Sequence, residues 1–153
     1  MQKVVLRPAT SADGEFAYRV KRAAFKEYVE QLWGWDEKQQ RALHEERFRA
    51  QTFYVVEKLG KAVGIMARVR EQDRVKLNQL FILPQYQSRG IGTECIKHVI
   101  RDAANSGLPI ELGVLKINQR AMNLYARLGF SATGESETHV YMQRSSGRAT
   151  NVE

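Results

Sequence analysis

Two glycines that follow an apolar stretch are the residues of this chain whose spacing best suggests chemistry. Leu80-Phe81-Ile82-Leu83-Pro84 is typical of a strand, and Gln87-Ser88-Arg89-Gly90-Ile91-Gly92-Thr93 is typical of a glycine-rich turn that leads into a helix. The glycines let successive backbone N–H groups point into one concavity, and the first turn of the helix adds unpaired donors and the positive end of its dipole. This geometry predicts a site for an anionic diphosphate.

The neighbouring residues exclude two common diphosphate sites. A nucleotide P-loop would need Lys and then Ser or Thr after the second glycine, and a dinucleotide-binding turn would need a third glycine where Cys95 stands. The stretch from Gln87 to Gly92 instead resembles the acetyl-coenzyme A loop, Q/R-x-x-G-x-G/A, of the GCN5-related N-acetyltransferases (GNAT family). A lone Gly-x-Gly pair also occurs where an ordinary helix begins, so the loop alone leaves that alternative open.

A second block strengthens the resemblance. Residues 117–130, Ile-Asn-Gln-Arg-Ala-Met-Asn-Leu-Tyr-Ala-Arg-Leu-Gly-Phe, are similar to another GNAT block, in which an Asn opens a helix and Leu-Tyr, a spacer and Leu-Gly-Phe follow. Together the two blocks cover roughly residues 77–130. The resemblance implies a GNAT-like acyl-CoA N-acyltransferase fold, with acetyl-CoA as co-substrate.

In the reaction that the resemblance implies, an acceptor amine attacks the acetyl thioester directly. The tyrosine of the family block corresponds to Tyr125, the expected general acid for the departing thiolate, because a phenol is neutral at physiological pH. The Ile82 backbone N–H is the expected oxyanion contact. The resemblance places the following residues at the cofactor: Leu80, Phe81, Ile82, Gln87, Ser88, Arg89, Gly90, Ile91, Gly92, Thr93, Asn118 and Tyr125.

Each of these roles has a structural alternative. Leu80 to Leu83 could be a buried central strand, although the resemblance implies that the backbone groups of Leu80, Phe81 and Ile82 also pair with the pantetheine arm like an added strand. Tyr125 shares a helical stripe with Ala121, Leu124 and Leu128, a pattern that is typical of a core side chain. Asn118 is a favoured N-cap in any protein.

The general base is unknown from the sequence. Where some relatives have a strand glutamate, this chain has Gly113. Glu111, two residues earlier on the same strand face, and His139 on a late strand are the alternatives, beside water-mediated deprotonation or an acceptor amine of low pKa. For the acceptor we expect Tyr28, Trp33, Trp35 and His139, with the nearby carboxylates of Glu30, Asp36 and Glu37 suited to a cationic amine. The two tryptophans could instead anchor the junction of two helices.

The elements that must position these residues follow from hydrophobic periodicity and turn signals. The pattern predicts strands and helices of an α/β fold. The resemblance implies that they form a mixed, mostly antiparallel sheet that is splayed between the fourth and fifth strands and has helices on both faces. A capping signal at residues 10–13 opens the first helix, and the other helices are expected over residues 36–49, from the glycine turn to about 105–107, and over 118–129. Strands are expected at residues 4–6, 52–57, 62–70, 75–83, 110–115, 131–133 and 137–142.

Composition limits the class of protein. The 153 residues suit one domain, expected over residues 1–144 with a loose tail over 145–153, and the absence of a long apolar run or signal peptide favours a cytoplasmic protein. The single cysteine, Cys95, lies among apolar helix positions and is expected to be buried. No Cys and His cluster has metal-ligand spacing, so no metal is expected. The net charge is +7, but the Lys and Arg residues are scattered along the chain, which makes a nucleic-acid partner unlikely.

The leading hypothesis is an acetyl-CoA-dependent N-acetyltransferase that acts on a primary amine of a small molecule, a peptide or a protein. The alternative is a non-catalytic CoA-sensing or regulatory binding module on the same fold, which the missing glutamate at Gly113 would suit. Tyr125 argues against that alternative. An acyl group other than acetyl, and a homodimer formed through the final strands, stay open.

Overall fold

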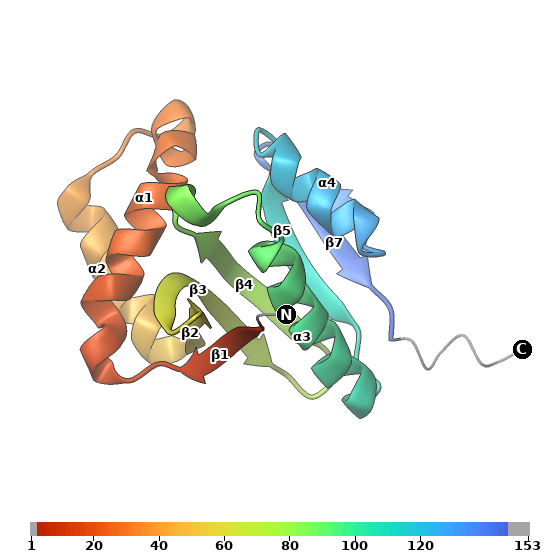
Figure 1. The fold of residues 1–153 in the computed structure, drawn as a ribbon. Coiled ribbons are helices and arrows are strands. Elements are labelled where there is room, and N and C mark those ends of the chain that lie inside the picture. Colours follow the sequence, from red (N-terminus) through yellow and green to blue (C-terminus); the bar gives the residue numbers. More distant parts are fainter. Residues whose placement is uncertain (1–2, 147–153) are drawn as a thin grey trace, which may run out of the picture. The chain divides into compact units, whose positions relative to one another are not determined.

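The computed structural model describes residues 3–146 of the chain, and its helices and strands occur in the order expected from the sequence (Figure 1). The bounds are β1 Val4–Pro8, α1 Gly14–Leu32, α2 Glu37–Ala50, β2 Thr52–Lys58, β3 Lys61–Arg70, β4 Val75–Ile82, α3 Ile91–Ser106, β5 Ile110–Leu115, α4 Gln119–Arg127, β6 Ser131–Glu135 and β7 His139–Arg144. The tail expected over residues 145–153 lies, from residue 147 on, outside the described residues.

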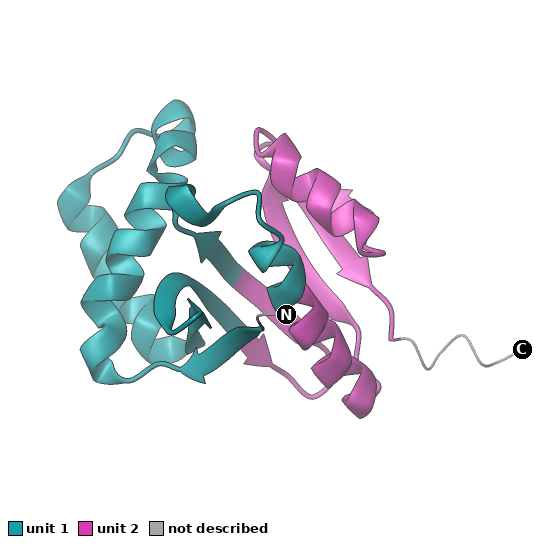
Figure 2. Ribbon diagram, viewed as in Figure 1, with its two compact units in different colours: residues 1–68, 79–95 teal, residues 69–78, 96–153 magenta. Residues whose placement is uncertain are grey.

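The chain divides into two compact units, coloured separately in Figure 2. Unit 1 comprises residues 1–68 and 79–95, and unit 2 comprises residues 69–78 and 96–153. Strands β3 and β4 and helix α3 each contribute residues to both units. The glycine-rich turn therefore belongs to unit 1, and the second block of the resemblance belongs to unit 2.

In unit 1, aspartate side chains accept backbone hydrogen bonds at the starts of the two helices. The Thr10 backbone N–H donates to Asp13 Oδ2 (2.7 Å) just before α1, and Asp36 Oδ1 accepts from the Gln39 backbone N–H (3.1 Å) at the start of α2. Both contacts satisfy donors that a helix start would otherwise leave unpaired. The capping signal expected at residues 10–13 is thus confirmed, and Asp36 caps the second helix, expected over residues 36–49.

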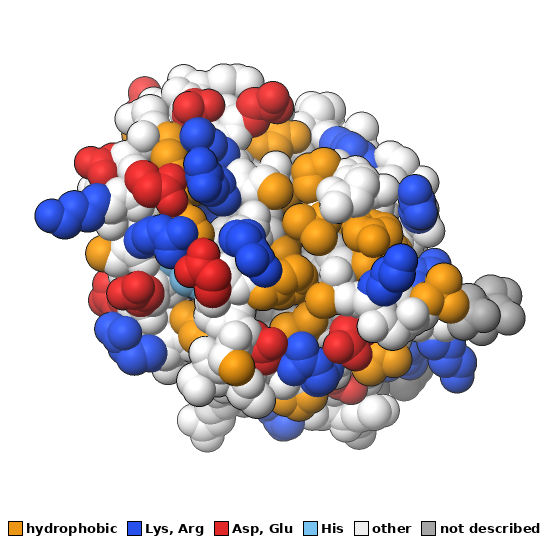
Figure 3. Space-filling view, turned by 60° about the vertical axis from the view of Figure 1, so that its left-hand side comes forward, with side chains coloured by type: hydrophobic (Ala, Val, Ile, Leu, Met, Phe, Trp, Pro, Cys, Tyr) orange, Lys and Arg blue, Asp and Glu red, His pale blue; other side chains and the backbone are white. Residues whose placement is uncertain are grey.

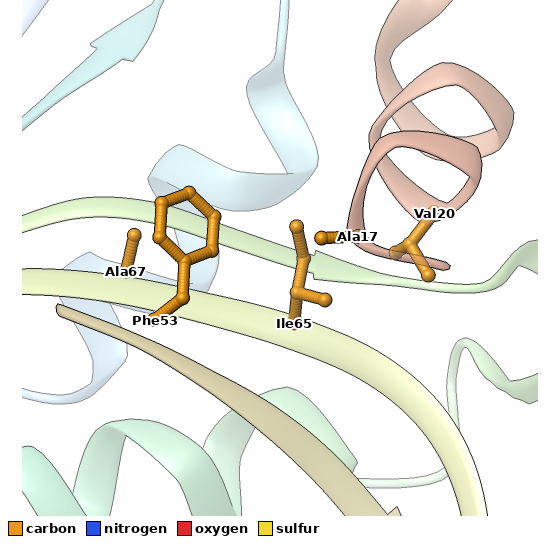
Figure 4. Close-up of a cluster of buried hydrophobic side chains, with 5 residues drawn as sticks. All are labelled: Ala17, Val20, Phe53, Ile65 and Ala67. Atoms are coloured by element: carbon orange, nitrogen blue, oxygen red, sulfur yellow. The ribbon is translucent and has the colours of Figure 1, made fainter. Parts of the chain in front are cut away.

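The core of unit 1 joins α1 to the antiparallel strands β2 and β3. Ala17 and Val20 of α1 lie against Phe53 of β2 and Ile65 and Ala67 of β3, and all five side chains are at most 5% exposed (Figure 4). Ile65 and Ala67 share one face of β3 because side chains alternate along a strand. Burial of each large apolar side chain stabilises the fold by about 1.5–3 kcal/mol. This cluster gives β3 a fixed place beneath α1.

In unit 2, β5 is central. Its first residues pair in parallel with the start of β4, at Val75↔Ile110 and Lys76↔Glu111. Along its whole length β5 pairs antiparallel with β7, and Gly113 lies opposite Tyr141. β6 pairs antiparallel with the other side of β7. The parallel pairs of β4 and β5 thus lie where both strands begin.

The hydrogen-bonded strand order is β1-β2-β3-β4-β5-β7-β6. The β4–β5 pairing is parallel, and the β1–β2, β2–β3, β5–β7 and β6–β7 pairings are antiparallel. The expected mixed, mostly antiparallel sheet is therefore confirmed. The last strand begins at His139 rather than residue 137, because the Ser136 hydroxyl accepts from the Thr138 and His139 N–H groups and holds a turn there. Within residues 3–146, no helix is both long and apolar enough to cross a membrane.

Candidate active site

The glycine-rich turn of unit 1 lies between the end of β4 and the start of α3. β4 ends at Ile82, and a 3₁₀ turn over Pro84–Tyr86 carries the chain to Gln87. Ser88 and Gly90 have φ angles of 65° and 81°, in the left-handed region that glycine adopts most easily. A Cβ added to Gly90 would meet no atom within 4 Å, so the space beside this backbone is open.

The start of α3 follows Gly90 directly. Ser88, Arg89 and Gly90 are exposed, whereas the Ile91 side chain is buried and fixes the first helical residue. The Glu94 backbone N–H donates to the Gly90 carbonyl (3.1 Å), so the N–H groups before it precede the first intrahelical hydrogen bond. These donors and the helix dipole favour an anion. Binding of the expected diphosphate at this turn stays a prediction.

A side-chain hydrogen bond connects this turn to the end of β4. Gln87 Nε2 donates to the Ile82 backbone carbonyl (2.9 Å), and the next backbone N–H, of Leu83, donates to the Val63 carbonyl of β3 (2.9 Å). The peptide group between Ile82 and Leu83 is thus held on both sides. A direct contact of Gln87 with the cofactor, expected from the sequence, stays a prediction.

The aromatic acceptor candidates of unit 1 differ in exposure. The ring of Tyr28 lies 6.1 Å from that of Phe25, which in turn lies 4.8 Å from the ring of Phe81 on β4. Trp33, at the C-terminal end of α1, is 59% exposed. Trp35 Nε1 donates to Glu37 Oε1 (2.9 Å), which holds this indole at the junction of α1 and α2. Trp33 is thus accessible to the expected amine, Tyr28 is half-buried, and Trp35 has the anchoring contact of the structural alternative.

Two of the three carboxylates expected near the amine already have partners within unit 1. Glu37 accepts from the Tyr18 hydroxyl (2.7 Å) and forms an ion pair with Arg41 (3.4 Å), and hydrogen bonds from Trp35 and Tyr18 hold its pKa below the usual value. Asp36 caps α2. Figure 3 shows acidic and basic side chains interspersed on one face of the molecule. Glu37 and Glu15 form ion pairs with Arg22 and Arg41 in unit 1.

In unit 2, the second sequence block forms α4. Asn118 Oδ1 accepts from the Ala121 backbone N–H (3.2 Å), so its capping role is confirmed. Tyr125 is 9% exposed, and its ring lies 5.6 Å from that of Phe130, whose backbone N–H donates to the Tyr125 carbonyl (3.0 Å). Gly129, between them, has a φ of 95° that turns the chain back. Tyr125 is thus at the edge of a core, and its role as general acid stays a prediction.

The place of the missing strand glutamate is occupied. A Cβ added to Gly113 would lie 3.2 Å from two ring atoms of Tyr141, the residue opposite it on β7. The Tyr141 ring is stacked on that of His139, with centroids 6.1 Å apart and an interplanar angle of 8°. The glycine at position 113 is therefore what allows this aromatic pair to lie close to the backbone of β5.

The two candidate bases have partners of different kinds. Glu111 forms an ion pair with Arg74 (3.2 Å) through one oxygen and accepts from Gln143 Nε2 (3.2 Å) through the other. His139 Nδ1 lies 2.8 Å from the Thr138 hydroxyl, and the tautomer of the ring decides which of the two groups donates. These contacts favour a structural role for Glu111 more than for His139.

Cys95 is fully buried in α3, as expected from the sequence, and burial raises the pKa of its thiol to about 12. Such a thiol is a packing residue and not a nucleophile. Among residues 3–146 there is no group of three His, Cys, Asp or Glu side chains that could hold a metal ion.

Sequence reasoning missed two residues of these sites. Gly64, inside the apolar stretch of β3, approaches the end of β4 closely, and a glycine within a strand pattern is the signal that could have found it. Tyr141 was missed because only the register of β5 and β7 places it opposite Gly113, and no local sequence pattern gives that register.

Comparisons with known proteins agree with this arrangement. The model of the acetyltransferase (GNAT) family matches residues 17–130. An uncharacterized N-acetyltransferase of Mycobacterium tuberculosis is 39% identical over 77 residues, which cover 49% of this chain and 49% of the relative. A thialysine N-epsilon-acetyltransferase of Mus musculus is 44% identical over 64 residues, which cover 41% of this chain and 38% of the relative. The chain thus spans about half the length, or less, of these relatives.

Solved structures share the fold. The PaiA N-acetyltransferase of Thermoplasma acidophilum, in complex with coenzyme A, has a TM-score of 0.76 at 16% identity and covers 94% of this chain and 99% of its own. The ribosomal-protein-S18-alanine N-acetyltransferase of Escherichia coli has a TM-score of 0.74 at 18% identity, with 100% and 99% covered. At such low identity the likeness extends to the fold alone, and it confirms the mixed α/β acyltransferase fold expected from the sequence. Because the family model spans most of the chain, the protein belongs to the GNAT acetyltransferase family.

Proposed function

We propose that this protein is an N-acetyltransferase that moves an acetyl group from acetyl-CoA to a primary amine by direct attack. The observation that carries the proposal is the turn at Gly90, whose left-handed backbone, open flank and helix start suit a diphosphate, in a chain that belongs to the GNAT family. Acetyl-CoA is the co-substrate in this proposal. The remaining cofactor contacts are those expected from the sequence, from Leu80 to Thr93 and at Asn118 and Tyr125.

The steps of the reaction are divided among the residues named above. The Ile82 backbone N–H donates to the oxyanion that develops on the thioester carbonyl, and the Tyr125 hydroxyl protonates the thiolate of coenzyme A as the C–S bond breaks. The acceptor amine must lose a proton, which passes to water or to the imidazole of His139. Glu111 is the weaker candidate because both of its oxygens have partners.

The acceptor is a primary amine of a small molecule, a peptide or a protein. The Mus musculus relative is named for a thialysine acceptor, and the Escherichia coli protein that shares the fold is named for an alanine of a ribosomal protein, so both kinds of acceptor belong in a test. Tyr28, Trp33, Trp35 and His139 are the proposed acceptor contacts. Of the three carboxylates expected near a cationic amine, Asp36 caps a helix and Glu37 forms an ion pair. Glu30 is therefore the proposed partner of the amine.

The first experiment is a calorimetric titration with acetyl-CoA, compared with Gly90→Val and Gly60→Val variants. Gly60 is a matched control because it also has a positive φ (76°) and also has no atom within 4 Å of an added Cβ, but it lies in the turn between β2 and β3. Saturable binding that only Gly90→Val abolishes supports the cofactor site. Absence of binding to the folded wild-type protein contradicts the proposal.

The second experiment is thiol release from acetyl-CoA with a panel of amines: thialysine, lysine, a diamine and a peptide with an N-terminal alanine. Release above the amine-free rate supports the transferase. Binding of acetyl-CoA without release for any amine would instead support the non-catalytic CoA-binding module. A single domain over residues 1–144, a cytoplasmic location and a homodimer stay predictions, which limited proteolysis, cell fractionation and sedimentation would check.

A further inference from the structure

Gly64 lies at an unusual place for a glycine, in the middle of a buried strand. Its neighbours Val63, Ile65, Met66 and Ala67 are at most 1% exposed. A glycine within a strand loses more conformational entropy on folding than other residues and costs about 0.5–1 kcal/mol relative to Ala. Such a residue usually marks a place where another backbone comes close.

The backbone that comes close is the end of β4. A Cβ added to Gly64 would lie 2.5 Å from the Phe81 carbonyl oxygen, 2.8 Å from Ile82 Cδ1 and 3.2 Å from Ile82 Cα. A contact under 3.0 Å cannot persist, so a side chain at position 64 would push the Phe81 oxygen and the backbone of β3 apart by about half an ångström. All of these atoms belong to unit 1.

The Phe81 carbonyl and the Ile82 N–H belong to the same peptide group. Because a peptide group is planar and its C=O and N–H point in opposite directions, a push on the oxygen turns or shifts the N–H by a similar amount. The following peptide group is fixed, because its carbonyl, of Ile82, accepts from Gln87 and its N–H, of Leu83, donates to Val63. The peptide group that carries the Ile82 N–H is therefore confined on two sides. On one side Gly64 comes close to the Phe81 oxygen, and on the other the Ile82–Leu83 peptide group is held by two hydrogen bonds.

We propose that Gly64 is a positioning residue for acetyl transfer: by having no side chain, it lets the Phe81–Ile82 peptide adopt the orientation in which the Ile82 N–H faces the thioester carbonyl. This inference rests on the proposed function. Oxyanion donors act over tenths of an ångström, and loss of one donor lowers kcat by about 10²–10³-fold. The diphosphate turn lies after the fixed Ile82–Leu83 peptide, so binding of the diphosphate does not depend on Gly64.

The test compares Gly64→Ala with Gly134→Ala in the full chain. Gly134 is the matched control because it is also a strand glycine, in β6, and a Cβ there would meet no atom within 4 Å. We measure kcat and KM by thiol release with the best amine of the panel, and calorimetric affinity for adenosine 3′-phosphate 5′-diphosphate, which is coenzyme A without its pantetheine arm. We expect kcat of Gly64→Ala to fall by about tenfold or more. We expect its affinity for the nucleotide, and kcat of Gly134→Ala, to stay within about twofold of wild type.

A double variant separates the backbone contact from the side-chain contact. Ile82→Val removes Cδ1, the atom 2.8 Å from the added Cβ, but leaves the Phe81 oxygen in place. If Gly64→Ala/Ile82→Val stays about tenfold below Ile82→Val alone, the backbone contact is responsible. If the double variant reaches the Ile82→Val value, side-chain crowding explains the loss and the inference is overturned.

The remaining outcomes are also decisive. An inactive wild-type protein contradicts the proposed function itself, before Gly64 is tested. An active wild type with a folded Gly64→Ala variant as active as Gly134→Ala overturns the positioning role alone. Loss of folding in both Gly64→Ala and the double variant, seen by circular dichroism, also overturns it, because Gly64 would then serve the fold and not the reaction.

Discussion

The ring of Tyr141 lies against the backbone of Gly113, where a Cβ would come within 3.2 Å of two ring atoms. The space beside Gly113, where the resemblance places the strand glutamate of some relatives, is therefore filled by an aromatic side chain from the neighbouring strand. A glutamate at position 113 and the Tyr141 ring compete for one space. Restoring the carboxylate is thus a different experiment with and without that ring.

We predict that Gly113→Glu alone does not raise turnover by more than about twofold, whereas Gly113→Glu/Tyr141→Ala exceeds Tyr141→Ala by about 100-fold, at the low end of general-base catalysis. The measurement is thiol release as a function of pH with a fixed amine. A tenfold gain from Gly113→Glu alone would show that the ring does not block the carboxylate.

Replacement of Tyr125 by Phe removes one hydroxyl and keeps the ring that contacts Phe130. We expect kcat to fall by about 100-fold, because the thiolate would leave without a proton donor, and the affinity for acetyl-CoA to change by less than about twofold. Kinetics of thiol release and calorimetry give the two numbers. The control is Tyr54→Phe, which removes a hydroxyl on β2 that accepts a hydrogen bond from Arg68 on β3. Equal turnover in the two variants would remove the assigned role.

The fate of these residues shows what the sequence could predict. The strand at Ile110–Leu115 and the cap at Asn118 follow from local patterns, periodicity and a polar residue before a helix, and both are confirmed. The contacts of Gly64 with Phe81, and of Gly113 with Tyr141, join residues that are far apart in the sequence. They depend on strand register, which no local pattern encodes, and that is why the sequence left the space at Gly113 undescribed.

The acceptor side illustrates the same limit. Glu37 looked suited to a cationic amine from its neighbours in the sequence, but the folded chain gives it Tyr18, Trp35 and Arg41 as partners. Tyr18 is on α1, so this contact also depends on how two helices pack. Local composition shows that a carboxylate is present, and only the tertiary structure shows that it is engaged.

Asn118→Ala is expected to lower the free energy of unfolding by about 1 kcal/mol, the usual value of a lost N-cap, and also to weaken acetyl-CoA binding. Asp36→Ala is the matched control, since Asp36 caps α2 through the same kind of hydrogen bond but is not a proposed cofactor contact. Urea unfolding and calorimetry are measured on both variants. A loss of stability in Asn118→Ala with wild-type affinity would leave only the capping role.

His44 should make the protein less stable in acid. Its side chain is 3% exposed among the rings of Tyr18, Phe48 and Phe53, its Nε2 contacts the Gly14 carbonyl, and its Nδ1 is buried without a hydrogen-bond partner among the described residues. Burial lowers its pKa below the usual 6.5. The unfolded chain therefore takes up the proton first, and stability falls as the pH drops below 6.5.

The check on His44 is urea unfolding at about pH 5 and pH 7.5 for the wild type and His44→Phe. We expect the wild type to lose more stability between these pH values than the variant, because phenylalanine has no proton to bind. Parallel losses in the two proteins would assign the acid sensitivity to other groups, such as the carboxylates paired with arginine.

Lys21 should lower stability at neutral pH, because its side chain is 2% exposed and burial of its charged ammonium group is unfavourable. Burial, with a smaller effect of the Arg47 charge, lowers its pKa from 10.5 to about 8. One pKa unit corresponds to about 1.4 kcal/mol, so Lys21→Met should stabilise the fold by up to about 3 kcal/mol at pH 7. Between pH 8 and 10.5 the folded protein loses this proton while the unfolded chain keeps it, so the wild type gains stability and the advantage of Lys21→Met shrinks. Comparing the two proteins at each pH cancels the titration of Cys95 and Tyr18, which both share. An advantage that does not change between pH 7 and pH 10 would mean that the ammonium of Lys21 is already well solvated in the folded protein.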